Sequence, residues 1–225
     1  MDYAVNIEQL IFSYRGSKAV LRIPALAIAR GEKIFLHGPS GCGKTTLLGI
    51  LAGVLKANEG RVMILGQDLA QMSGASRDAL RGAHIGYIFQ MFNLIPYLNV
   101  LENIILPCRI SKVRQQRLNG QSLEDEARKL AERLGIKAII VDNVIDLSVG
   151  QQQRVAAARA LLGAPELIIA DEPTSALDED HREGFLRLLF DQCQDLGSTL
   201  IFVSHDRRMM SAFDRAVSLD EINQA

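Results

Sequence analysis

The chain has 225 residues, of which 48% are hydrophobic, so it can bury a substantial core as one domain with an insertion or as two closely joined lobes. Its 25 basic and 26 acidic residues give a formal net charge of −1 without a long block of one sign, which argues against a nucleic-acid partner. The cysteines at 42, 108 and 193 lie far apart without a Cys-x-x-Cys pair, so the sequence predicts neither a disulfide framework nor a zinc site.

The N-terminal part predicts an antiparallel β layer. Two segments, 4–12 and 19–29, are rich in Val, Ile and Leu with partial alternation, and a turn at 15–18 separates them. Tyr14 is a candidate platform for a nucleotide base, although ordinary packing also explains a tyrosine at a strand end. We expect neither a signal peptide nor a membrane-spanning helix, because no stretch reaches about 18 uninterrupted apolar residues. Any membrane role would then come through a partner.

Residues 38–46 match G-x-x-x-x-G-K-[ST], the phosphate-binding loop. The loop lies between a predicted strand at 33–36 and a predicted helix at 46–52, as the motif requires. Its glycines let successive N–H groups face an anion, and the following helix adds its positive dipole end. The alternative is a glycine-rich turn without a ligand. The candidate binding residues in the loop are Gly38, Ser40, Gly41, Cys42, Gly43, Lys44, Thr45 and Thr46.

Two side chains of this loop have predicted roles in the chemistry. Lys44 would reach the β and γ phosphates of a nucleotide, and the Thr45 hydroxyl would ligate the Mg²⁺ that bridges them. Cys42 is a variable position of the motif, so it is either a small filler or a point at which thiol modification affects nucleotide binding.

The middle of the chain predicts strands at 60–66 and 85–90 and a short helix at 76–81. Gln90 ends the second of these strands, which by itself marks only the strand's exit to solvent. From about 91 to 146 the pattern is mostly helical and predicts an inserted helical lobe. Within it, the basic stretch 112–120 is predicted to be a solvated connector.

The third quarter of the chain predicts a helix and a buried strand. Residues 147–154, Leu-Ser-Val-Gly-Gln-Gln-Gln-Arg, open an alanine-rich helix with Ser148 as its N-cap. The apolar run 166–170 predicts a buried parallel strand, and it ends in Asp171 and Glu172. Placing two negatively charged carboxylates at the end of a buried strand costs free energy unless a cation lies near them. A metal–phosphate centre would supply that cation.

The C-terminal part predicts a turn at 175–178, a helix at 179–194 and a buried strand at 199–203 that leads to His205. A lone histidine is usually a structural group. This one follows a strand as Gln90 and Asp171 do, and in open α/β sheets ligands gather at the carboxyl ends of strands. Beyond it we expect one short helix and a strand-like segment at 216–219.

Together these motifs resemble the nucleotide-binding subunit of an ATP-binding cassette (ABC) transporter over essentially the whole chain. Six motifs carry the resemblance in the family's order: Walker A at 38–46, the Q-loop at Gln90, the signature at 147–151, Walker B at 167–172, the D-loop at 175–178 and the switch histidine at His205. Within the family, the sequences of segments 85–90, 94–96 and 101–103 resemble those of the lipoprotein-releasing, macrolide-exporting and cell-division ATPases. The short stretch of sequence after His205 also resembles that branch.

The resemblance implies a single ABC ATPase domain over 1–225 with an α/β P-loop NTPase fold. Its sheet core would be mixed and mostly parallel, with an N-terminal antiparallel β layer and an inserted α-helical lobe. Segments 1–90 and 147–225 would form the RecA-like core, and about 91–146 the lobe, with the signature helix starting at 147.

The resemblance also implies roles for single residues. ATP and Mg²⁺ would bind, with the metal near Thr45, Gln90 and Asp171. Glu172 would be the general base or water-orienting group, with Gln90 and His205 as the other catalytic residues. Tyr14 matches the position that stacks on adenine. A second copy of the chain would complete the site with its Ser148, Gly150, Gln151 and Asp178.

The implied partners are this second copy and integral membrane permease subunits, with no nucleic acid. The apolar segment Met91–Tyr97 is the candidate docking surface, and core packing of Phe92 and Leu94 is the competing explanation. The protein would be cytoplasmic and peripheral on the inner face of the cell membrane, serving export or mechanotransmission. The alternative is a soluble ABC-type ATPase of a system such as iron–sulfur cluster assembly.

One position departs from the family's pattern. The signature normally holds two glycines, but Val149 precedes Gly150 in this chain. Since a β-branched residue does not easily adopt a positive φ, we expect ordinary helix-entry geometry at Val149 and unimpaired hydrolysis.

Overall fold

The structure is a computed structural model that describes residues 2–16, 18–175 and 177–225. Ser17, in the predicted turn, and Ala176, in the predicted D-loop, lie outside the described residues.

The N-terminal strands form an antiparallel sheet, as predicted. Strands β1 (Tyr3–Phe12), β2 (Leu21–Ala29), β4 (Glu59–Ile64) and β5 (Gln67–Asp68) lie in the order β2-β1-β4-β5. Ile7 of β1 stands opposite Leu26 of β2 on one side and Val62 of β4 on the other. These apolar cross-strand neighbours build one buried face of the sheet.

The second sheet is parallel. Strands β6 (Ile85–Ile88), β7 (Leu167–Asp171), β8 (Thr199–Val203), β3 (Lys33–His37) and β9 (Arg215–Ser218) lie in the order β6-β7-β8-β3-β9, and each neighbouring pair is parallel. Their carboxyl ends therefore share one edge. The phosphate-binding loop, Gln90, the Asp171–Glu172 pair and His205 all follow strand ends at this edge.

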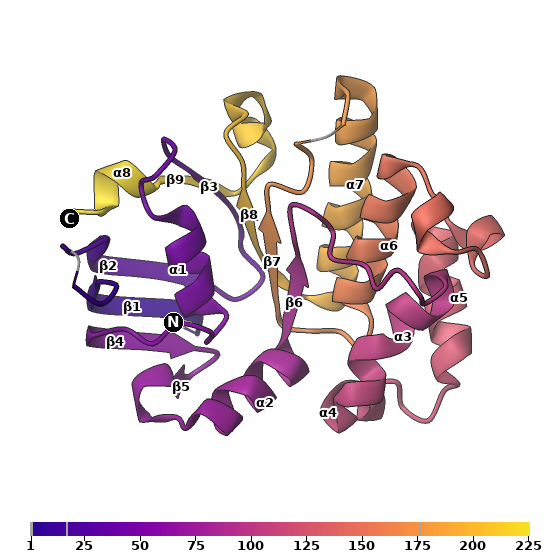
Figure 1. The fold of residues 1–225 in the computed structure, drawn as a ribbon, viewed down its shortest axis with the longest axis horizontal. Helices are drawn as coiled ribbons and strands as arrows, with labels where there is room; N and C mark the ends of the chain where they lie inside the picture. The colour runs from indigo at the N-terminus through magenta and orange to yellow at the C-terminus, as the bar shows by residue number, and fades with distance from the viewer. Residues whose placement is uncertain (1, 17, 176) are drawn as a thin grey trace.

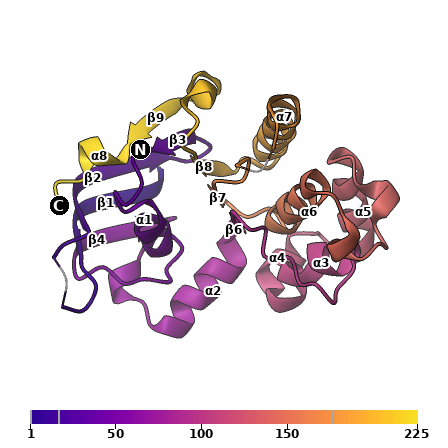
Figure 2. The same cartoon turned by 45° about the horizontal axis from the view of Figure 1, so that its top comes forward.

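The helices take their places around these sheets (Figure 1). They are α1 (Lys44–Leu51), α2 (Gly74–His84), α3 (Val100–Ile110), α4 (Lys112–Gln116), α5 (Leu123–Arg133), α6 (Val149–Leu161), α7 (Glu179–Leu196) and α8 (Leu219–Ile222), with 3₁₀ turns at Leu69–Gln71, Lys137–Ile139, Val144–Asp146 and Arg207–Ala212. Figures 1 and 2 both show α3, α4 and α5 grouped with α6, away from the antiparallel sheet. Within the part of the chain that is described, no helix has the length and apolar character to cross a bilayer.

Two hydrophobic clusters cover opposite faces of the parallel sheet, because successive side chains of a strand point to opposite faces. Phe35 and Phe202 belong to the cluster that includes residues of α3, α5, α6 and α7. Ile34 and Ile201 belong to the cluster that includes residues of the antiparallel sheet and α1. The predicted α/β fold class, with its antiparallel layer and helical insertion, is confirmed.

The prediction of a solvated connector at 112–120 is correct for most of its residues, which are exposed, but wrong for Arg114 and for the local structure, because Lys112–Gln116 form α4. Arg114, in α4, is only 2% exposed. Its guanidinium donates hydrogen bonds of 2.6–3.1 Å to four backbone carbonyls, those of Gly82, Ile85, Ala160 and Leu162. Burial lowers the pKa of Arg114 to about 10. Arg114 thus joins α4 to the C-terminal ends of α2 and α6 and to the first residue of β6, where helix ends leave carbonyls without intrahelical partners.

Three smaller details also differ from the predicted elements. The helix expected at 76–81 extends over Gly74–His84, with Ser73 as N-cap. The segment after His205 contains a 3₁₀ turn and the short helix α8 where one helix was predicted. The helix predicted from 99 begins at Val100, after its N-cap Asn99, whereas the helix predicted from 123 begins at Leu123 as expected.

Candidate nucleotide site

The phosphate-binding loop connects β3 to α1. Its glycines Gly41 and Gly43 have φ values of 81° and 101°, a region that favours glycine, and Gly43 is the N-cap of α1. Side-chain atoms at Gly43 would also collide with Leu21, because a Cβ there would lie 2.7 Å from its Cδ2. Glycine is therefore favoured at Gly41 and Gly43 by their positive φ, and at Gly43 also by the lack of space beside Leu21.

Lys44 bends back over the loop. Its Nζ donates to the carbonyl oxygens of Gly38 at 2.7 Å and Pro39 at 3.0 Å. An ammonium group has three donors, so one remains to reach an anion in the loop. Lys44 is thus placed as a cation at the centre of the site.

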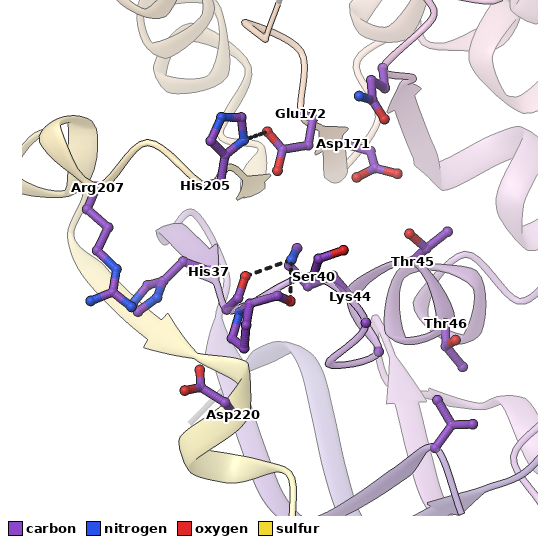
Figure 3. Close-up of a pocket in the computed structure, with 16 residues that line it drawn as sticks. His37, Ser40, Lys44, Thr45, Thr46, Asp171, Glu172, His205, Arg207 and Asp220 are labelled. Carbon is purple, nitrogen blue, oxygen red and sulfur yellow. Dashed lines mark hydrogen bonds and ion pairs between the residues drawn. The ribbon is translucent and has the colours of Figure 1, made fainter.

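A cavity of about 830 Å³ opens above this loop (Figure 3). Its volume lies within the range of ligand sites, about 300–1,000 Å³. The predicted site residues that line it are Gly38, Ser40, Gly41, Gly43, Lys44, Thr45, Thr46, Gln90, Asp171, Glu172 and His205. The structure therefore brings residues from four strand ends to one cavity.

Asp171 ends β7 and faces this cavity. Burial, and next the neighbouring Glu172, raise the pKa of its carboxyl, while Lys44 and a hydrogen bond from Tyr87 lower it. Burial and Asp171 together raise the pKa of Tyr87, so it stays a neutral donor. Tyr87 was not predicted as a site residue. Its place in β6, next to β7, explains how it reaches Asp171.

Glu172 has a left-handed backbone, with φ of 48°. This conformation costs a non-glycine residue on the order of 1 kcal/mol. Its N–H donates to the Val203 carbonyl at 3.0 Å, and its Oε2 lies 2.9 Å from Nδ1 of His205. Figure 3 draws this pair above the loop. The left-handed turn is thus held by the neighbouring strand at the position predicted for the general base.

The segment after Gln90 contains a second pair of left-handed residues. Phe92 and Asn93 have φ of 57° and 49°. Arg159, on α6, donates to both of their carbonyls at 2.6 Å. Burial lowers the pKa of Arg159. The part of the candidate docking segment that follows Gln90 is therefore attached to α6, the helix that the signature opens.

The candidate docking segment divides between core and surface. Phe92 is 8% exposed and belongs to the hydrophobic core, and Leu94 packs against that core, as the competing explanation proposed. Met91 and Tyr97 are 81% and 82% exposed. The accessible apolar surface of this segment is therefore limited to those two side chains and their exposed neighbours.

Tyr14 lies next to the cavity without lining it. Its hydroxyl is 3.2 Å from Oγ1 of Thr46, and its ring packs edge-on against Phe12. The side chain is 50% exposed, so an open aromatic surface remains. Both the packing and the base-platform interpretations have support in these contacts.

The signature residues form the start of α6, outside the cavity. Ser148 and Gln151 form a capping box, in which Oγ of Ser148 accepts from the Gln151 N–H and Oε1 of Gln151 accepts from the Ser148 N–H. Val149 is the first residue of the helix and is 45% exposed. The expected helix-entry geometry at Val149 is confirmed.

The D-loop residue Asp178 also lies outside the cavity. It is the N-cap of α7, where its carboxylate accepts from the His181 N–H, and it is 68% exposed. A Cβ added to Gly150 would lie 3.9 Å from Leu177 Cδ2, so D-loop and signature are neighbours. Ser148, Gly150, Gln151 and Asp178 of this chain do not reach its own cavity.

Several residues of the site had not been predicted from the sequence. Tyr87 contacts Asp171 without lining the cavity, and the lining residues that had not been predicted are Val20, His37, Pro39, Arg207 and Asp220. His37 precedes the loop, while Arg207 and Asp220 follow β8 and β9 at the same sheet edge. The rule that ligands gather at strand ends would have found these three, had it been applied to every predicted strand.

The donor set suits Mg²⁺ bound together with phosphates. Among the described residues there is no group of three or more His, Cys, Asp or Glu that could hold a metal alone. Mg²⁺ commonly takes only one or two carboxylates and completes its shell with phosphate oxygens and water. The raised pKa of Asp171 shows a carboxylate that lacks full compensation for its burial, which a cation beside it would provide.

Known proteins resemble this chain along most of its length. The sequence profile of a family described as ABC transporter matches residues 21–175. The uncharacterized ABC transporter ATP-binding protein YbbA of Escherichia coli (strain K12) is 42% identical over 197 residues, covering 86% of this chain and 83% of that protein. The lipoprotein-releasing system ATP-binding protein LolD of Bacteroides fragilis (strain YCH46) is 34% identical over 219 residues, covering 97% and 99%. A solved structure titled as a dimeric post-hydrolysis state of the ATP-binding cassette MJ0796, bound to ADP and Pi, superposes with a TM-score of 0.80 at 33% identity, covering 95% of this chain and 93% of that chain.

Proposed function

The chain belongs to the ABC transporter family, and we propose from the geometry of its cavity which residues carry out each part of its reaction. It is the ATP-binding and ATP-hydrolysing subunit of a transporter, and it works as a dimer with membrane subunits. The predicted resemblance to the lipoprotein-releasing branch is confirmed by its relatives. The alternative of a soluble ATPase in cluster assembly finds no support among them.

The single observation that supports the residue assignment is the convergence of Lys44, Asp171, Glu172 and His205 on one cavity above the loop. The loop amides and Lys44 bind the phosphates of ATP. Glu172 accepts the proton of the attacking water or orients it toward the γ-phosphorus. His205, which holds the Glu172 carboxylate at 2.9 Å, hydrogen-bonds the γ-phosphate. Tyr14 stacks on the adenine beside the loop.

Thr45, Asp171 and Gln90 would hold Mg²⁺ at this cavity. The ion, when bound, neutralises the charge that develops on the β and γ phosphate oxygens. Tyr87 keeps the Asp171 carboxylate oriented through its hydrogen bond.

A second copy completes the site. Ser148 and Gly150 lie at the N-terminus of α6, whose N–H groups and dipole suit a phosphate. Since they lie outside their own cavity, we propose that they contact the γ-phosphate bound by the partner copy, with Gln151 and Asp178 beside them. ATP would then close the dimer and hydrolysis would open it.

The membrane subunits dock, in this proposal, on the surface around Met91 and Tyr97. Next to it, Phe89, Leu106 and Ile110 line a groove of about 540 Å³ between β6 and α3. Ile110 is 74% exposed, so the groove continues the apolar surface. The protein would be peripheral on the inner face of the cell membrane, serving export or mechanotransmission. The segment 91–146 would act as the lobe that transmits the motion to the core.

Phosphate release from ATP tests the catalytic assignment. The variant Lys44→Met should lose nearly all activity, whereas the matched surface variant Lys129→Met should keep it, because Lys129 is exposed on α5. Wild-type turnover by Lys44→Met would overturn the assignment of the site.

Co-purification from a detergent extract tests the docking surface. The double variant Met91→Ser/Tyr97→Ser should lose the membrane subunits that the wild type retains, with ATP hydrolysis preserved. The control Val54→Ser removes another exposed apolar side chain, 62% exposed, which lies after α1. If the double variant retained the membrane subunits as well as the wild type does, the docking surface would have to lie on another part of the protein.

A further inference from the structure

Asn223, the residue after α8, connects the phosphate-binding loop to Val20 and Arg22, at the start of β2. Its Nδ2 donates to the carbonyls of Cys42 at 3.2 Å and Val20 at 3.0 Å. Its Oδ1 accepts from the Arg22 N–H at 2.7 Å. Only this orientation of the amide satisfies the contacts, because the reverse would set its oxygen against two carbonyl oxygens. One side chain thus joins three segments that are far apart in sequence.

The loop lies between the start of β2 and the segment around α8, which carries Asn223. On one side, a Cβ on Gly43 would lie 2.7 Å from Leu21 Cδ2. On the other, a Cβ on Gly38 would lie 3.4 Å from Oδ1 of Asp220. Figures 1 and 2 both place α8 beside β2 and β9. Asn223 is therefore positioned to act on the loop from the side opposite to the cavity's catalytic carboxylates.

The carbonyl that Asn223 holds belongs to the same peptide unit as the N–H of Gly43. In a planar trans peptide these two groups point in opposite directions, so fixing the carbonyl also fixes the N–H. Gly43 has φ of 101° and no Cβ, so rotation of this peptide plane meets little steric resistance from the residue itself. The hydrogen bond from Asn223 supplies a restraint that the loop's own glycines lack.

We propose that Asn223 is a positioning residue of the nucleotide site, which orients the Cys42–Gly43 peptide so that the Gly43 N–H faces the bound phosphates. It acts through the main chain and does not touch the nucleotide. The bond to Val20, which lines the cavity, anchors the same amide to the cavity wall. This inference rests on the proposed ATP site.

The test compares Asn223→Ala and Asn223→Asp with the wild type and with the control Gln224→Ala, an exposed neighbour. Asn223→Ala removes the hydrogen bond that restrains the Cys42 carbonyl, together with those to Val20 and Arg22, and should weaken ADP binding about tenfold. Asn223→Asp should weaken it further, because a carboxylate would face two carbonyl oxygens. KM for ATP should rise by a similar factor while kcat stays within about twofold. The control should bind ADP as the wild type does.

A spectroscopic measurement separates orientation from general loosening. In the wild type, ADP should shift the ¹H–¹⁵N resonance of Gly43 strongly downfield, because its N–H then donates to a phosphate. At saturating ADP, Asn223→Ala should lack most of this shift, while amide resonances away from the loop, such as those of α5, keep their wild-type positions. Should that variant fail to fold, Asn223→Ser, which keeps a small polar group, takes its place in both measurements.

Unchanged ADP affinity together with an unchanged Gly43 resonance in the variants would overturn the inference. A change in kcat at constant KM would do the same, because it would place the effect on the chemical step. Failure of the wild type itself to bind ADP would instead refute the proposed nucleotide site.

Discussion

Oε2 of Glu172 lies 2.9 Å from Nδ1 of His205, although the two residues are 33 positions apart in the chain. They meet because β7 and β8 are parallel neighbours, with Asp171 opposite Val203 at their ends. The side chain of Glu172 is 13% exposed and that of His205 is 72% exposed. The accessible histidine therefore holds a largely buried carboxylate, and whatever binds the histidine also affects that carboxylate's position.

Replacing Glu172 by Gln should trap the ATP-bound state. The amide keeps the size of the side chain but cannot accept the proton, so turnover should fall at least about 100-fold while ATP still binds. Light scattering should then show a stable dimer with ATP, and phosphate release should be nearly absent. Glu183→Gln, an exposed carboxylate on α7, is the control. A variant that stays monomeric with ATP would contradict the composite site.

Val149→Gly should leave the rate of ATP hydrolysis within about threefold of the wild type. Val149 already has helical geometry as the first residue of α6, so no left-handed strain exists for glycine to relieve. Glycine at this position is expected to cost a few tenths of a kcal/mol of helix stability. Steady-state hydrolysis checks the rate. A much faster variant would show that the valine side chain obstructs the site.

Arg114→Met should destabilise the fold by about 3 kcal/mol, because four backbone carbonyls lose a charged donor. Urea denaturation measures the free energy of unfolding. The matched control is Arg128→Met, an exposed arginine on α5, for which a change within about 0.5 kcal/mol is expected. Equal midpoints for the two variants would mean that water replaces the buried guanidinium without loss.

Asp206 should contribute to stability in a pH-dependent way. Hydrogen bonds from Arg208 lower its pKa to about 2, and Arg182 also pairs with its carboxylate. Since the folded protein binds this proton more weakly than the unfolded chain, whose aspartates have a pKa of about 3.9, the contribution is complete above about pH 4. It is lost as the pH falls through about 2.

The variant Asp206→Asn measures this contribution. Its free energy of unfolding should be lower than that of the wild type at pH 7, and the gap should narrow as the pH falls below about 4. Asp195→Asn serves as control, because Asp195 is 60% exposed in its ion pair with Arg133. A gap that stays constant down to the lowest pH at which both proteins fold would exclude a role for the Asp206 charge.

Much of the site could be predicted because its residues sit at strand ends that local patterns reveal. The apolar run before Asp171 and the one before His205 identify buried parallel strands, and such strands place their carboxyl ends at one edge. The phosphate-binding loop is recognised by the spacing of its glycines, lysine and threonine. All these patterns involve residues close together in the sequence, so they can be identified without knowledge of the tertiary structure.

The remaining features depend on contacts between distant segments. Nothing near Arg114 in the sequence shows that two helix ends converge on it, so its charge suggested a surface position. Asn223 and Tyr87 act through a carbonyl and a carboxylate that only the folded chain brings near them. Residues that position others by long-range hydrogen bonds leave no periodic pattern to read.

The hydrogen bonds from Arg159 to the carbonyls of Phe92 and Asn93 connect the candidate docking segment directly to α6. A displacement of the backbone at Phe92 and Asn93 would either break two charged hydrogen bonds or move α6 with it. The end of that helix carries Ser148 and Gly150. In the proposed dimer, a force applied by a membrane subunit to one copy would therefore change the contacts of Ser148 and Gly150 with the nucleotide bound by the other copy. The position of the membrane subunit on one copy would thus affect ATP hydrolysis in its neighbour.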